Sequence, residues 1–192
     1  MPFTSRGEAV HDPKILRAIA HPARSRILDE LHASGPLRAA DVARLLDVPA
    51  NQASFHLRQL AKYGLVEPAP ELAKDGRDRV WRTVPGGLRL DDEDLEGPGA
   101  KAAHTVFMDQ KAAFARVMVD RAFAKRKATK EVVYIAVMDA LRLSKEEGDE
   151  FMTEVTEVVD RWSKKTRGTD PHRKTYAFLS LVQPYPEADL GK

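Results

Sequence analysis

The sequence predicts an α+β fold that is mainly helical, and three observations support this class. Apolar residues repeat every three or four positions over several segments, which is the spacing of one face of an α-helix. An Asp-Gly pair lies between two short candidate strands, which is a hairpin signal. Residues 100–127 form a longer run of helical composition. With 192 residues, the chain can form one or two small domains with a hydrophobic core.

Two helices are expected before residue 35. The first begins at Pro13, which follows Asp12 in an arrangement typical of helix starts. The second covers about residues 22–33, and the Gly-Pro pair after it ends it. Each helix carries a buried apolar stripe, consisting of Ile15, Leu16 and Ile19 in the first and of Ile27, Leu28 and Leu31 in the second.

Residues 38–64 contain two short amphipathic helices that meet at a tight turn, Asp47-Val48-Pro49. The proline cannot continue the first helix but suits the first turn of the second, so the break and the restart coincide. The second helix, about residues 49–63, buries a stripe made of Ala53, Leu57 and Leu60. This is a helix-turn-helix pattern, which indicates DNA binding and makes the second helix the candidate recognition helix.

The exposed face of this recognition helix carries side chains that can read base pairs. Asn and Gln can bridge N6 and N7 of adenine, Arg can bond O6 and N7 of guanine, and an aromatic ring can lie against a thymine methyl. Phe55 stands opposite the buried stripe, where the solvated face of an ordinary surface helix would not select it. The predicted DNA-binding residues are Asn51, Gln52, Ser54, Phe55, His56, Arg58, Gln59 and Lys62, with His56 at the edge of the buried stripe.

A β-hairpin is expected after the recognition helix, with strands in residues 65–72 and 78–84. Pro68 and Pro70 restrict the first strand to an edge or a bulge, so it should be short. The hairpin would be a wing, about residues 72–80, that contacts the phosphate backbone or the minor groove. A polar hairpin tip without a DNA contact is the alternative. The cationic residues of the hairpin are Lys74, Arg77, Arg79 and Arg82, of which the first three are the predicted contacts.

Motifs spaced along residues 11–90 resemble those of ArsR-type winged-helix repressors. A His-Pro-x-Arg-x-x-Ile-Leu segment opens at His21, and a Ser-x-His-Leu-x-x-Leu segment opens at Ser54 and leads to Gly-Leu-Val. The resemblance implies a homodimeric repressor that binds double-stranded DNA, with half-sites about 34 Å apart. The matching residues are His21, Pro22, Arg24, Ile27, Leu28, Ser54, His56, Leu57, Leu60, Gly64, Leu65 and Val66.

The chain contains no cysteine, no signal-peptide pattern and no apolar run of about 18 residues, so we expect a soluble, cytoplasmic protein. Many ArsR-like repressors sense soft metals through cysteines before the recognition helix, and residues 38–46 hold none. The six histidines are scattered, so neither a metal site nor a cofactor is expected. No residues show a catalytic arrangement, and an enzyme is therefore not expected.

Three segments organise the chain. Residues 1–90 would form the DNA-binding domain and have four more basic than acidic residues, whereas residues 91–192 have two fewer. Residues 91–99 are an acidic Gly/Pro linker. The helix over about 100–127 is a candidate homodimerisation helix, because a helix this long must bury its apolar stripe somewhere. Internal core is the alternative for that stripe.

The rest of the region 100–192 is expected to be a strand-helix-strand unit. The strands are residues 138–143 and 175–182, and the helix opens with the capping box Ser144-Lys145-Glu146-Glu147. Residues 131–137 are either helix or strand. The unit is either a dimer scaffold or a pocket for a small-molecule effector. The aromatic residues that would line such a pocket are Phe114, Tyr134, Phe151, Trp162, Tyr176 and Phe178.

Two other functions remain open from the sequence. The winged helix could dock a partner protein through Phe55, and such a module would show almost no salt-dependent binding to random duplex. The chain could also be an architectural DNA-binding protein, which would return no motif when DNA is selected from a random pool.

Overall fold

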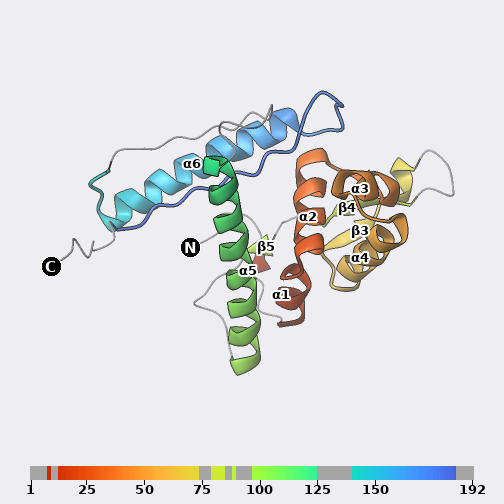
Figure 1. The fold of residues 1–192 in the computed structure, drawn as a ribbon, viewed down its shortest axis with the longest axis horizontal. Coiled ribbons are helices and arrows are strands. Elements are labelled where there is room, and N and C mark those ends of the chain that lie inside the picture. The colour runs from red at the N-terminus through yellow and green to blue at the C-terminus, as the bar shows by residue number, and fades with distance from the viewer. Residues whose placement is uncertain are drawn as a thin grey trace. The chain divides into compact units, whose positions relative to one another are not determined.

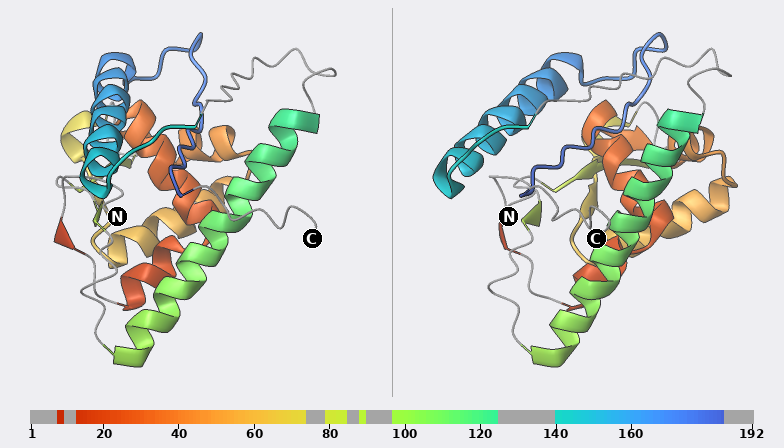
Figure 2. Two further views of the ribbon diagram at one scale, coloured as in Figure 1. Left: turned by 90° about the vertical axis from the view of Figure 1, so that its left-hand side faces the viewer. Right: turned by 60° about the vertical axis from the view of Figure 1, so that its left-hand side comes forward.

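The computed structural model describes residues 8–9, 13–73, 79–84, 88–89, 97–124 and 140–184, and it divides into two units. The first unit comprises Met1–Ala113 and Lys165–Thr175, and the second comprises Phe114–Lys164 and Tyr176–Lys192. Figures 1 and 2 show the helices of the first unit gathered beside a small sheet. None of the described helices has both the length and the apolar character that a membrane span needs.

Four helices open the first unit. They are α1 (Pro13–Ile19), α2 (Pro22–Ser34), α3 (Ala39–Leu46) and α4 (Ala50–Lys62), close to the predicted ranges. Local residues explain their ends. The Nδ1 of His21 accepts a hydrogen bond from the backbone N–H of Ala23 at 3.2 Å and so caps α2. Asp47 ends α3 in the left-handed region, with φ of 54°, and Pro49 precedes α4.

The same unit contains a three-stranded antiparallel sheet, in the order β2 (Leu37–Arg38), β4 (Val80–Thr83), β3 (Val66–Pro68), of which β2 lies between α2 and α3 in the chain. As predicted, the strand that contains Pro68 is short, and it leads into a single 3₁₀ turn, Pro70–Leu72. The sequence did not indicate β2, nor the pair of two-residue parallel strands β1 (Glu8–Ala9) and β5 (Leu88–Arg89). The hairpin tip, residues 74–78, lies outside the described residues.

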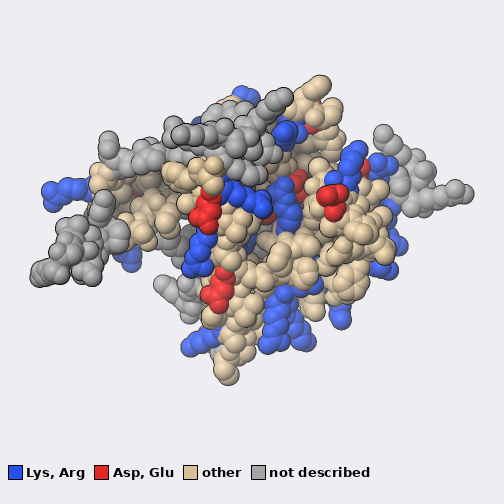
Figure 3. Space-filling model, in the orientation of Figure 1, with Lys and Arg blue, Asp and Glu red and all other residues tan. Residues whose placement is uncertain are grey.

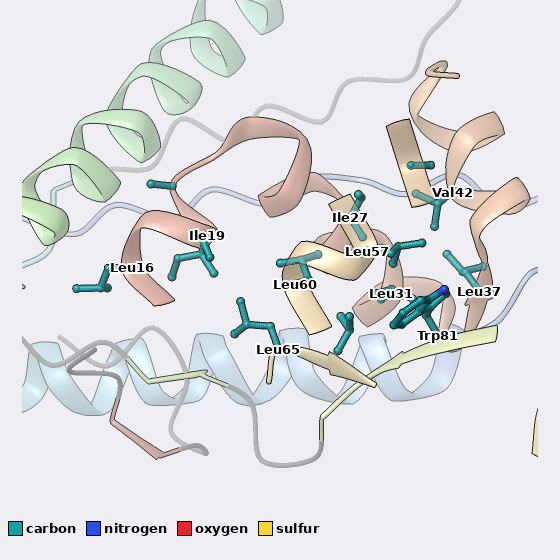
Figure 4. Close-up of a cluster of buried hydrophobic side chains, with 14 of the residues drawn as sticks. Leu16, Ile19, Ile27, Leu31, Leu37, Val42, Leu57, Leu60, Leu65 and Trp81 are labelled. Carbon is teal, nitrogen blue, oxygen red and sulfur yellow. The ribbon is translucent and has the colours of Figure 1, made fainter. Parts of the chain in front are cut away.

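The core of the first unit is a continuous cluster of aliphatic side chains between the helices and the sheet (Figure 4). Side chains such as Leu31 and Leu57 are fully buried, and burying each of them stabilises the fold by roughly 1.5–3 kcal/mol. Trp81 joins the cluster from β4. The labelled members in Figure 4 are Leu16, Ile19, Ile27, Leu31, Leu37, Val42, Leu57, Leu60, Leu65 and Trp81.

The long helix α5 (Gly97–Ala124) begins inside the predicted linker and ends slightly before the predicted residue 127. In the first unit it packs on the core through Ala103 and Phe107, and Ala100, three residues before Ala103, is also buried. Beyond Ala113 its larger apolar residues are exposed, including Phe114, Val117, Val119 and Phe123. The first half of the stripe is therefore internal core, and the second half is not buried within the described residues.

A carboxylate buried in α2 lies beside the chain that follows α6. The carboxylate of Glu30 pairs with the guanidinium of Arg26 at 2.5 Å and accepts a hydrogen bond from the hydroxyl of Thr175 at 2.7 Å. Buried charges need such partners, because an unpaired one is strongly destabilising. Residues 165–175 thus belong with the first unit, although they are far from it in sequence.

The second unit contains α6 (Lys145–Thr166), and its N-terminus confirms the predicted capping box. The N–H of Glu147 donates to Oγ of Ser144 at 3.2 Å, and the N–H of Ser144 donates to Oε2 of Glu147 at 2.7 Å. These reciprocal bonds satisfy N–H groups that lack partners inside the helix. The start of α6 was therefore predictable from four residues.

The predicted C-terminal strands were wrong within the described residues. Residues 140–143 and 175–182 contain no strand, and residues 131–137 lie outside the described part of the chain. Alternating β-formers become a strand only when a neighbouring strand supplies hydrogen bonds and packing. The segment 175–182 exposes Tyr176, Phe178 and Leu181 instead. The fold class is confirmed as mainly helical α+β with a small antiparallel sheet, but without the strand-helix-strand unit.

The aromatic residues predicted to line an effector pocket do not enclose one in the part of the chain that the structure describes. Phe114 and Trp162 are each about half exposed, and Tyr176 and Phe178 are more exposed still. Tyr134 lies outside the described residues. Phe151 is half-buried, and the other described aromatics of this set lie at the surface.

Candidate nucleic-acid interface

The two faces of α4 differ sharply in burial. Ala53, Leu57 and Leu60 are fully buried, whereas the exposed face holds polar and cationic side chains around Phe55, which is 49% exposed. Ser54 and Gln59 are half-buried and lie at the border. The predicted residues that the structure brings together on the exposed face are Asn51, Gln52, Phe55, Arg58 and Lys62.

Two of the exposed polar side chains are oriented by bonds to the helix backbone. The Nε of Arg58 donates to the carbonyl of Ser54 at 3.2 Å, which lays the guanidinium along the helix surface. The Oδ1 of Asn51 accepts from the N–H of Gln52 at 2.9 Å in the first turn. A guanidinium has five N–H donors, and an amide also has an NH₂ group. Both side chains can therefore bind a ligand while keeping these bonds.

His56 lies apart from the other predicted contacts. Its side chain is buried, at 4% exposure, and its ring centroid is 4.7 Å from that of His21 and 5.5 Å from that of Phe55. Burial is the main cause that lowers the pKa of both histidines, and the charge of Arg24 adds to it. A residue at the edge of a helical stripe can face either way, and the ring of His21 accounts for the inward position here.

The start of α3 is fixed by a charged network around Asp41. The Oδ2 of Asp41 accepts from the Nε of Arg38 at 2.9 Å and from the backbone N–H of Arg38 at 3.2 Å. These bonds hold the pKa of Asp41 below its usual range. Arg44 reaches the other oxygen at 3.3 Å but is largely exposed. Sequence reasoning missed Arg44, whose place on the first helix of the pair is where such folds meet the phosphate backbone.

The described cations of the hairpin divide into two kinds. The guanidinium of Arg79 is exposed and lies 5.7 Å from the ring centroid of Trp81. Arg82 instead bonds the carboxylates of Glu67 at 2.7 Å and Glu71 at 2.5 Å, and these partners raise its pKa. Arg82 therefore ties β4 to β3 and to the following turn. Lys74 and Arg77 lie outside the described residues.

The surface and the residue types together favour a polyanionic ligand. In Figure 3, Lys and Arg side chains project from the molecule near α4. Among the described residues, no three histidine, aspartate or glutamate side chains are placed to hold a metal ion. The short helix pair, its exposed face and the following hairpin are the parts of a winged helix-turn-helix.

The family model described as a helix-turn-helix domain matches residues 19–69, which span α2, α3, α4 and β3. Residues 19–69 are a helix-turn-helix domain. The helix-turn-helix predicted within this range and its resemblance to ArsR-type regulators are thus confirmed. In transcription regulators, such domains place their second helix in the major groove of DNA.

Several solved structures are similar to the chain that carries this helix-turn-helix domain. A possible transcriptional regulator for arsenical resistance is 28% identical, over 56% of this chain and 95% of its own, with a TM-score of 0.32. The MepR–DNA complex of S. aureus is 17% identical, over 73% of this chain and 78% of its own, with a TM-score of 0.35. Apo MarR of E. coli is 13% identical, over 78% of this chain and 88% of its own, with a TM-score of 0.35. Among curated proteins, none matches the chain.

Proposed function

We propose that the protein is a homodimeric transcription regulator, a repressor by its family resemblance, that binds double-stranded DNA sequence-specifically through α4. The observation that carries this proposal is Phe55. An aromatic side chain stands half exposed amid polar and cationic groups, while the opposite face of the same helix is fully buried. The contact with His56 covers only part of this ring, and a thymine methyl in the major groove would cover more of it.

The other side chains have roles that follow from their positions. With α4 in the major groove, Asn51 and Gln52 would bond adenine and Arg58 would bond guanine. Lys62 at the end of α4 and Arg44 on α3 would contact phosphates, which position the protein without reading sequence. The wing would add Lys74, Arg77 and Arg79 along the backbone or in the minor groove.

Replacing Phe55 and Arg58 together by alanine is expected to reduce the preference for the operator over scrambled duplex by about 30-fold or more, because each base contact contributes roughly 1–3 kcal/mol of discrimination. The operator is first selected from a random DNA pool. Fluorescence anisotropy then gives both affinities for the wild type, the double variant and Lys101→Ala, an exposed control on α5.

The outcomes separate the alternatives. An unchanged preference in the double variant would show that α4 does not read the bases. A selection that returned no motif would indicate an architectural protein. If random duplex bound without salt dependence, the exposed face of α4 would be a protein-docking surface, because phosphate binding releases counterions.

The homodimer is proposed from α5. Met108, Ala112, Ala115, Val119 and Ala122 follow one another at spacings of four, three, four and three, the pattern of a coiled-coil seam. By helix geometry this seam lies about 100° around α5 from the stripe that packs on the core. Met108 and Val119 are exposed, and alanines between them allow a second helix to approach closely.

Val119→Glu is expected to weaken dimerisation by about 100-fold, because each copy would then bury an unpaired carboxylate. Arg121→Glu is the matched control, since Arg121 is exposed on the side of α5 away from the seam. Sedimentation equilibrium should give twice the 21.4 kDa chain mass for the wild type and the control, and the chain mass for Val119→Glu. A dimer that survives Val119→Glu would place the interface elsewhere.

A further inference from the structure

A pair of histidines lies behind the exposed face of α4, and no proposed DNA contact uses it. His56 comes from the middle of α4, and His21 caps the start of α2. Their ring centroids are 4.7 Å apart and their planes meet at 48°. Because Nδ1 of His21 accepts from the N–H of Ala23, the ring of His21 is held in place. The pair therefore joins the recognition helix to the N-terminus of α2.

The surroundings of His56 suit a neutral ring and not a charged one. Neither of its ring nitrogens has a hydrogen-bond partner among the described residues, and the side chain is buried. A protonated imidazole has two N–H donors and a charge, which would both be left without compensation. Protonation of the His56 imidazole in the folded protein therefore costs substantial free energy.

The charged groups that act on this pair come from α2 and are cationic. Protonated His21 and Arg24 both disfavour a charge on His56. Arg24 is anchored toward α1, where its Nε donates to the carbonyl of Ala18 at 2.5 Å and its Nη2 to that of Arg17 at 3.1 Å. Burial lowers the pKa of Arg24, and the phenol of Tyr63, after α4, partly offsets this lowering. A charge on His56 would thus add repulsion to desolvation.

Phe55 packs against the same ring. The rings of Phe55 and His56 meet nearly edge to face, with centroids 5.5 Å apart and planes at 67°. Edge-to-face aromatic pairs are favourable and directional. A displacement of the His56 ring would therefore remove the support beneath the exposed aromatic side chain of the recognition helix.

We propose that His56, stacked on His21, positions Phe55 and α4 for DNA only while both imidazoles are neutral, so that acidification weakens DNA binding. This inference rests on the proposed DNA-binding function. It makes His21 and His56 positioning residues and not DNA contacts. It also gives the regulator a response to pH that needs neither a cysteine nor a bound metal.

The direction of the effect follows from proton linkage. Burial lowers the pKa of both histidines in the folded protein below the ordinary value of 6.5. A state in which α4 has moved and the two rings are exposed to water therefore binds more protons at low pH than the native state does. The stability that the neutral pair contributes is complete above about pH 6.5 and is lost as the pH falls through that value toward the lowered folded-state values.

The test measures the binding of the full-length protein to a mixed-sequence duplex about three helical turns long, near pH 7.5 and near pH 5.5 at constant ionic strength. Wild-type affinity is expected to fall by about fivefold or more on acidification. His56→Phe keeps a ring that cannot be charged, and its affinity should stay constant or rise. His32→Gln, which changes an exposed histidine of α2, should behave as the wild type.

A second variant, His21→Asn, keeps the proposal testable if His56→Phe does not fold. His21→Asn keeps an N-cap acceptor but removes the stacked ring, so the fall in affinity should shrink. Circular dichroism confirms that each variant is folded, and if His56→Phe is not, His21→Asn decides. Equal pH dependence in the wild type and the folded variants would overturn the inference. Absence of duplex binding by the wild type near pH 7.5 would instead overturn the proposed function, and the inference with it.

Discussion

Replacing Trp81 by alanine is expected to lower the free energy of unfolding by about 3–5 kcal/mol. Trp81 is 4% exposed and lies in β4, the central strand, opposite Leu37 of β2 and Pro68 of β3. Its indole fills the space where the sheet meets the helical core. Alanine would leave a cavity there and would also remove the ring beneath the guanidinium of Arg79. Both the core and the base of the hairpin should loosen.

Urea unfolding followed by circular dichroism measures this effect. The chain has two tryptophans, and the other, Trp162, is 53% exposed on α6. Trp162→Phe is therefore the matched control, with an expected change of about 0.5 kcal/mol or less. In that control, Trp81 becomes the sole tryptophan reporter and should show a large emission shift on unfolding. Equal urea midpoints for Trp81→Ala and the wild type would mean that the indole is not part of the core.

The helices of the first unit were predictable because their signals are local. Pro22 and Pro49 mark helix starts, and apolar residues three and four positions apart mark the buried faces. The two faces of α4 followed from a rotation of 100° per residue, which placed Phe55 outside and Leu57 inside. Neither statement required knowledge of a distant part of the chain.

What the sequence could not settle depends on residues far apart in the chain. His56 lies at the border of the buried stripe, and its inward position depends on His21, which is on another helix. Arg82 is a hairpin cation to which the sequence assigns no partner, and the fold brings Glu67 and Glu71 to it. In both cases a side chain with two reasonable roles took the one that its spatial neighbours determined.

The strands show the same limit more strongly. Strands β1, β2 and β5 have two residues each, too few for a periodic pattern, and each exists because a partner strand lies beside it. Residues 175–182 show the opposite error, since they alternate like a strand but have none beside them among the described residues. Strand formation depends on pairing, which composition does not report.

Leu57→Ala is expected to lower the free energy of unfolding by about 2–5 kcal/mol. Leu57 is fully buried on the inner face of α4, in the same cluster as Ile27 and Leu31 of α2 (Figure 4). Truncation would remove apolar contacts and leave a cavity between the two helices. The loss is a large fraction of the roughly 5–15 kcal/mol by which native proteins are stable, so DNA binding should fall for every sequence.

Phe55→Ala is the matched control, because it truncates a large apolar side chain two residues away on the exposed face. Its free energy of unfolding should change by about 1 kcal/mol or less. If α4 reads DNA, Phe55→Ala nevertheless loses operator preference, whereas Leu57→Ala loses stability first and affinity for all duplexes with it. Urea unfolding and anisotropy on both variants therefore separate the structural face of the helix from the binding face. Comparable destabilisation by the two substitutions would contradict the division of α4 into these faces.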